Sequence, residues 1–129
     1  MPEDETTLAS QVFDQLQQAM AADPAGLTEL YRDYLADAWH SLRMLCNAAL
    51  RRRAEEFRTE AHRLKGSSLV LGARAVARCA AALEDMGLNT DVPSTDAMLE
   101  ETRRALQQVQ VELAERLGAG VLPANEPAA

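Results

Sequence analysis

Apolar residues recur along the chain at intervals of three and four, and this spacing predicts helices rather than strands. Turn-forming residues divide the pattern into five segments. The predicted helices cover residues 6–22, 27–51, 53–71, 74–86 and 94–117. The later connections are short, which favours neighbours of opposite direction. The expected fold is therefore all-α: an antiparallel up-down-up-down four-helix bundle with an additional N-terminal helix.

A few residue types set the expected boundaries. Thr6 or Thr7 is predicted to cap the first helix, and Asp23-Pro24-Ala25-Gly26 to break the chain after it. A second break is placed at 51–53, where the apolar stripe loses its phase. Gly72, Gly87 and Pro93 mark the later ends and starts, with Ser94 or Thr95 as the last cap. One domain is expected at 6–117, between a disordered N-terminus at 1–5 and a flexible tail at 118–129.

Composition agrees with one soluble helical domain. The 129 residues are 47% hydrophobic and only 4% aromatic, with a formal net charge of −7. A general nucleic-acid interface needs a basic surface and is not expected. Cys46 and Cys79 lack metal-site or disulfide-framework spacing and are predicted to be buried free thiols. The acidic N-terminus is unlike a signal peptide, and no apolar run is long enough to span a membrane, so a cytoplasmic monomer is expected.

The polar face of the 53–71 helix carries an unusual group of residues. His62 lies about 140° from the centre of the apolar face, so it is not expected in the core. Gly66, one turn later, is unfavourable within a helix, and packing does not call for it. Arg58, Arg63 and Lys65 surround His62 with positive charge in an otherwise acidic chain. These features favour a neutral imidazole that acts as a nucleophile toward a phosphoryl group. The apolar stripe of this helix consists of Phe57, Ala61, Leu64, Ser68 and Leu71.

The segment Ala61-His62-Arg63-Leu64-Lys65-Gly66-Ser67, followed by Gly72, resembles the signature of histidine-containing phosphotransfer (HPt) domains. These are helical-bundle carriers in multistep two-component phosphorelays. The resemblance covers roughly residues 6–117. One position departs from the family pattern, because Leu88 stands after Gly87 where many members carry a basic residue.

The resemblance implies a role for each matching residue. His62 would accept a phosphoryl group from an aspartate of one receiver domain and pass it to another. Lys65 would balance charge on the phosphoryl oxygens, and Gly66 would let the receiver approach. Ser67 is a weaker candidate for hydrogen bonding near the site. Glu84 is expected to accept a hydrogen bond from Nδ1 of His62, which would leave Nε2 as the nucleophile.

Partners and cofactors follow from the same resemblance. The partners would be receiver domains of hybrid histidine kinases and of response regulators, and Leu69 and Arg58 are candidates for contacting them. The chain would be a phosphoryl carrier rather than an independent enzyme. No metal or cofactor of its own is expected, since Mg²⁺ would sit in the receiver.

Three alternatives remain open from the sequence. A sensor-kinase dimerisation domain also carries a phosphorylated histidine, but typically with Glu after it where Arg63 stands here. The phosphoacceptor domain of a chemotaxis-type kinase has a close motif, although the short chain favours a free-standing carrier. A helical-bundle adaptor would bind receivers without phosphoryl chemistry. His40, the other histidine, lacks comparable surroundings and is assigned an ordinary structural or surface role.

Overall fold

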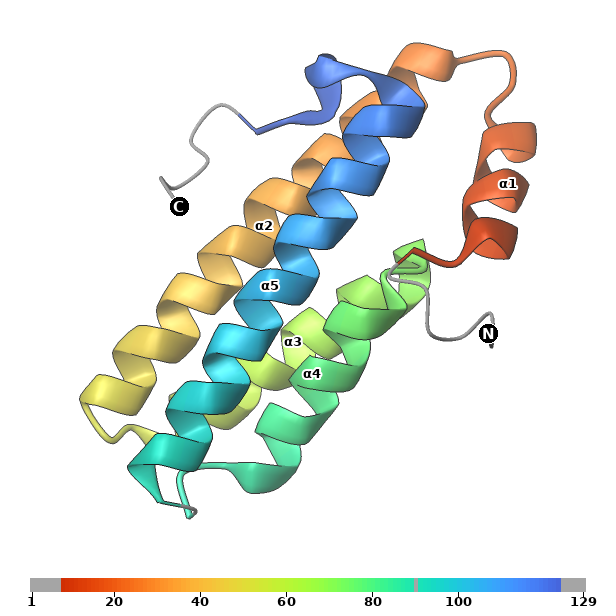
Figure 1. Cartoon of the computed structure of the whole chain (residues 1–129). Coiled ribbons are helices and arrows are strands. Elements are labelled where there is room, and N and C mark those ends of the chain that lie inside the picture. Colours follow the sequence, from red (N-terminus) through yellow and green to blue (C-terminus); the bar gives the residue numbers. More distant parts are fainter. Residues whose placement is uncertain (1–7, 90, 124–129) are drawn as a thin grey trace.

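The structure, a computed structural model, describes residues 8–89 and 91–123 and is an all-helical bundle. Helix α2 packs against α3 and α5, and α4 also packs against both, so these four close a ring around one core. Figure 1 shows them side by side, with α1 standing beside one end. The predicted all-α class is confirmed. The elements are α1 (Ser10–Ala19), α2 (Pro24–Leu50), α3 (Ala54–Leu71), α4 (Arg74–Met86), α5 (Val92–Leu117) and the short 3₁₀ helix η2 (Ala119–Val121).

Two aspartate–proline segments begin helices where the sequence predicted a break or a linker. The Asp23 carboxylate accepts a hydrogen bond from the Gly26 N–H at 3.0 Å, and Pro24 is the first residue of α2. Asp91 caps α5 in the same way by accepting from the Ser94 N–H at 3.1 Å. Proline fits the first turn of a helix because its missing N–H would have no partner there. Helix α2 therefore starts three residues earlier than predicted, and α5 two residues earlier.

The N-terminal helix is shorter than predicted. Leu8 and Ala9 are extended rather than helical, because Leu8 forms an isolated bridge with Ala73 and the Ala9 N–H donates to the Gly72 carbonyl at 2.7 Å. The Leu8 N–H also donates to Glu112 Oε1 at 3.1 Å. The first two contacts tie the chain to the turn between α3 and α4, and the bond to Glu112 ties it to α5. The proposed caps Thr6 and Thr7, like the N-terminus at 1–5, lie outside the described residues.

The core follows the predicted apolar stripes and contains a few paired polar groups. The Tyr34 hydroxyl lies 2.7 Å from Ser68 Oγ, and Tyr31 donates to the Leu71 carbonyl at 3.1 Å. Both tyrosines join α2 to α3 and help to set the rotation of α3 about its axis. Cys79 is buried, as predicted. Cys46 is exposed, so the prediction that it is buried was wrong: it lies at the edge of the α2 stripe, beside the seam with α5.

The break between α2 and α3 occurs where the sequence predicted it. Arg52 adopts a left-handed conformation with φ of 57°, which reverses the chain after α2. Its Nη2 donates to the Leu88 carbonyl at 3.0 Å and so ties this turn to the α4–α5 connection. Leu88 is itself buried, which explains how an apolar residue is accommodated after Gly87.

The segment after α5 also packs on the bundle. Val121 is fully buried, and η2 contacts α2 and α5. Residues 118–123 are therefore not part of a flexible tail, contrary to the expectation for 118–129. Residues 124–129 lie outside the described part of the chain.

Gly72 provides a test of the turn that ends the His62 helix. Its backbone is left-handed, with φ of 83° and ψ of 12°, so alanine there should cost about 1 kcal/mol or more in backbone strain. An added Cβ would also stand 2.9 Å from Val12 Cβ. We expect Gly72→Ala to lower the free energy of unfolding by about 2–3 kcal/mol. Urea denaturation measures the loss, and a loss of about 1 kcal/mol or less would contradict the contact with Val12.

Candidate functional site

His62 lies on α3 and points away from the core. Its neighbours Ala61 and Leu64 are buried in the bundle, whereas its side chain is 68% exposed. The buried stripe of α3 fixes this orientation, because a residue about 140° from the stripe must face outward. The sequence prediction that His62 is a surface histidine is confirmed.

A carboxylate on α4 connects His62 with Lys65. Glu84 Oε2 lies 2.9 Å from His62 Nδ1, and Glu84 Oε1 lies 2.9 Å from Lys65 Nζ. Glu84 therefore bridges the two residues with its two oxygens, and its own side chain is only 22% exposed. The hydrogen bond expected between Glu84 and the imidazole is present. The contact between Glu84 and Lys65 was not predicted.

This bridge determines which ring nitrogen of His62 is available. Two hydrogen bonds lower the pKa of the Glu84 carboxyl: the bond from Lys65, which has the larger effect, and the bond from His62. An ionised carboxylate can only accept hydrogen bonds, so Nδ1 must carry the proton that it donates to Glu84. In a neutral ring the lone pair then belongs to Nε2, which has no such partner among the described residues and is open to an incoming group.

Gly66 leaves the surface beside His62 open. Among the described residues, only the local helix backbone comes within 4 Å of the position that a Cβ on Gly66 would take. The missing side chain therefore relieves no clash inside this chain. Since glycine in a helix is less favourable than alanine, the bundle itself gains nothing from Gly66.

The three cations predicted around His62 are arranged differently from one another. Lys65 is held by Glu84, and Arg63 pairs with Glu60 at 3.3 Å on the other side of α3. The Arg58 guanidinium lies close to Gly87 at the end of α4, where Nη2 is 3.6 Å from the position of an added Cβ. Lys65 is thus the cation that shares a direct partner with His62.

The remaining candidates divide between the backbone and the exposed surface. The Ser67 hydroxyl donates to the Leu64 carbonyl at 3.3 Å, so it is engaged by its own helix. Leu69, two turns after His62, is 58% exposed. Val70, beside it, is more exposed still and was not singled out from the sequence. The sequence did contain a sign of this exposed position, because Val70 is an apolar residue outside the core stripe of its helix.

The charge state of Glu84 gives a testable pH dependence. Its folded-state pKa lies below the unfolded value of about 4.3, so the carboxylate stabilises the fold above that pH and the contribution disappears as pH falls through the folded pKa. We expect wild type to exceed Glu84→Gln in stability near neutral pH and the two to converge in acid. Denaturant unfolding between neutral pH and pH 3 measures this, with Asp85→Asn as a neighbouring control. A difference that persists at low pH would contradict the assigned charge.

Residues 8–89 and 91–123 contain no group of three or more His, Cys, Asp and Glu side chains that could hold a metal ion. None of the described helices has the length and apolar character needed to cross a membrane.

The comparison with protein families gives one match. The family model of the Hpt domain matches residues 6–112 of the 129-residue chain, which includes α1 to α4 and most of α5. All of the candidate site residues fall within the matched range. Neither the curated proteins nor the solved structures gave a match to this chain.

Proposed function

Because the chain belongs to the Hpt domain family, whose members carry phosphoryl groups in two-component phosphorelays, we propose that His62 is its phosphoryl acceptor and donor. The observation that supports this most directly is the exposed imidazole whose Nδ1 bonds to Glu84, which leaves Nε2 free beside Gly66. Receiver domains of hybrid histidine kinases and of response regulators would supply and remove the group.

The proposed transfer needs no proton movement at His62. Nε2 attacks the phosphorus of an aspartyl phosphate, the bond from phosphorus to the aspartate oxygen breaks, and the aspartate leaves as a carboxylate. The ring keeps its Nδ1 proton and becomes positively charged while phosphorylated. The Glu84 carboxylate, 2.9 Å from Nδ1, would stabilise that charge, so Glu84 acts as a positioning and electrostatic partner.

Lys65 would contribute through its remaining donors. An ammonium group has three N–H bonds, and Glu84 occupies one of them at 2.9 Å. The others could donate to phosphoryl oxygens while Glu84 holds the side chain near His62. Most of the work of phosphoryl transfer is positioning and charge neutralisation, which suits a carrier without catalytic machinery of its own.

Further parts of the proposal concern the surroundings of the site. Leu69 and Val70 would contact the receiver through their exposed apolar side chains, and Arg58 through its charge. Ser67 would have to leave the Leu64 carbonyl to contribute. The receiver would bring Mg²⁺, so this chain would need no cofactor. We further propose a cytoplasmic monomer whose domain, expected at 6–117, also includes η2, which packs on α2 and α5. We propose alternating helix directions in α2 to α5, supported by their short connections.

A transfer assay tests this function. The chain is mixed with Mg²⁺ and a panel of phosphorylated receiver domains, and the label that reaches it is characterised. We expect acid-labile, base-stable phosphate, as phosphohistidine requires. Label that is acid-stable would contradict the proposal, and receiver binding without any transfer would favour an adaptor.

Two substitutions of Glu84 test its proposed role. Glu84→Leu removes the acceptor for Nδ1–H and should slow transfer from a receiver about 10-fold, in the range typical of lost orienting partners. Glu84→Gln retains an amide oxygen that can accept the same bond, and should slow transfer only about threefold. Single-turnover transfer rates measured across pH distinguish the two variants. Equal loss in both would assign the effect to charge alone, and no loss in either would remove Glu84 from the mechanism.

A further inference from the structure

A second surface feature lies on the opposite side of the bundle from His62. Helices α2 and α5 border a groove with a volume of about 490 Å³. His62 and its partner Glu84 lie on α3 and α4, the other two helices of the four-helix ring, neither of which lines this groove. An occupant of the groove would therefore leave His62 accessible to a receiver.

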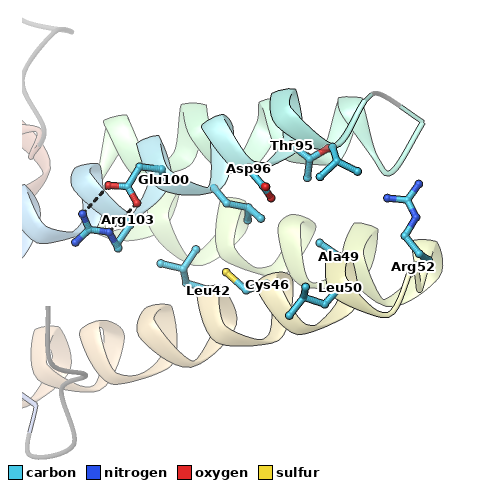
Figure 2. Close-up of a pocket in the computed structure, with 11 residues that line it drawn as sticks. Leu42, Cys46, Ala49, Leu50, Arg52, Thr95, Asp96, Glu100 and Arg103 are labelled. Carbon is cyan, nitrogen blue, oxygen red and sulfur yellow. Dashed lines mark hydrogen bonds and ion pairs between the residues drawn. The ribbon is translucent and has the colours of Figure 1, made fainter.

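The groove is mainly apolar, and its rim is exposed. Figure 2 shows Leu42, Cys46 and Leu50 of α2 facing Thr95 and Asp96 of α5. Leu50 is 83% exposed and Val92, at the same end, is 56% exposed. Apolar side chains exposed beside a hollow are typical of surfaces that bind a partner.

Two of the four charged side chains that line the groove are paired with each other, which leaves Asp96 and Arg52. Arg103 donates to both oxygens of Glu100, at 2.6 and 3.0 Å, and Arg52 donates to the Leu88 carbonyl. Within the described part of the chain, Asp96 has no hydrogen bond or ion pair. Partial burial raises the pKa of the Cys46 thiol, and the negative charge of Asp96 raises it further. Asp96 therefore acts on the α2 wall of the groove. The groove thus presents apolar surface with the unpaired Asp96 carboxylate beside Cys46, while Arg52, held by the Leu88 carbonyl, carries a positive charge at the end of α2.

The length of the groove fits a helix. Its α2 wall runs from Leu42 to Leu50, which is about 12 Å of helix, or two turns. Apolar side chains at i, i+4 and i+7 of a partner helix span a similar distance. A second copy is disfavoured, because it would bring another net charge of −7 and the same unpaired carboxylate.

We propose that the groove between α2 and α5 binds an amphipathic helix of another protein, which inserts aliphatic side chains and pairs a lysine or arginine with Asp96. The binding would be independent of phosphoryl transfer. It would allow this partner and a receiver domain to occupy the chain at the same time.

Two designed peptides test the chemistry directly. Both are alanine-based helices with leucine at i, i+4 and i+7, flanked by lysine in one peptide and by glutamate in the other. We expect the lysine peptide to bind, with saturable amide NMR shifts at Leu50, Val92 and Leu99, and at least 5-fold more tightly than the glutamate peptide. Leu50→Ser should weaken binding at least 5-fold, and Asp96→Asn should remove the preference between peptides. Val111→Ser, an exposed apolar position of α5 outside the groove, is the matched control and should change neither.

Several results would overturn the proposal. These are no saturable shift up to about 1 mM peptide, the weak end of specific binding, equal binding of both peptides, or shifts centred on Leu69 and Val70. Concentration-dependent dimerisation that Leu50→Ser abolishes would assign the groove to a second copy. None of these outcomes depends on His62, since the titration uses no phosphoryl donor. Label transfer to the Leu50→Ser and Asp96→Asn variants should equal that of wild type.

Discussion

His62→Gln is expected to reduce phosphoryl transfer from a cognate receiver by at least about 1,000-fold, to below detection. The glutamine amide nitrogen has no available lone pair and cannot replace Nε2 as a nucleophile. Because the His62 side chain is 68% exposed, its loss should not disturb the core. Glutamine is also a slightly better helix former than histidine, so the free energy of unfolding should change by only a few tenths of a kcal/mol.

His40→Gln is the matched control for this prediction. His40 is exposed on α2 and is the only other histidine in the chain. The His40→Gln variant should retain wild-type transfer, and both variants should bind the receiver with similar affinity. Label on His62→Gln with the acid lability of phosphohistidine would place the acceptor at His40. Loss of label in both variants would point to a role for histidine beyond a single acceptor.

The orientation of His62 was predictable because it depends on one helix. A stripe with a period near 3.6 residues fixes which residues face the core, and the stripe of α3 is unambiguous. His62, Gly66 and Leu69 must then lie outside it, as the structure has them. The sequence could not give the bridge from Glu84 to Lys65, because that contact depends on how α4 is aligned along α3. If α4 were shifted along α3 by a single turn, a residue on α4 would contact different partners on α3.

Other differences from the sequence prediction have local causes. Asp23-Pro24 contains the residues of a turn and equally those of a helix cap, so its composition alone does not distinguish the two. Cys46 belongs to the apolar pattern of α2 but lies at its edge, where burial depends on how closely α5 approaches. The groove at this seam was therefore invisible in the sequence. Leu8 is not part of the first helix, contrary to the prediction, because the Ala9 N–H donates to the Gly72 carbonyl and the Leu8 N–H donates to Glu112.

Gly66→Leu is expected to separate stability from transfer. Leucine is a better helix former than glycine by up to about 1 kcal/mol, and the position of its Cβ is open, so the free energy of unfolding should rise. The same side chain would stand one turn from His62, between Nε2 and the approaching receiver. A displacement of the reacting atoms by about 1 Å can cost about 100-fold in rate, and we expect a loss of this size. Gly66→Ala should show the same gain in stability and a smaller loss of transfer.

Ala97→Leu on α5 is the control for adding a leucine to an exposed helix position. Single-turnover transfer from a phosphorylated receiver and urea denaturation would be measured on all three variants. Ala97→Leu should leave transfer unchanged. If Gly66→Leu transferred at the wild-type rate, the open surface beside His62 would have no role in receiver approach. If it instead unfolded more easily, Gly66 would be required by the bundle, and its presence would need no partner to explain it. A more stable protein that transfers poorly is the outcome that only a docking role predicts.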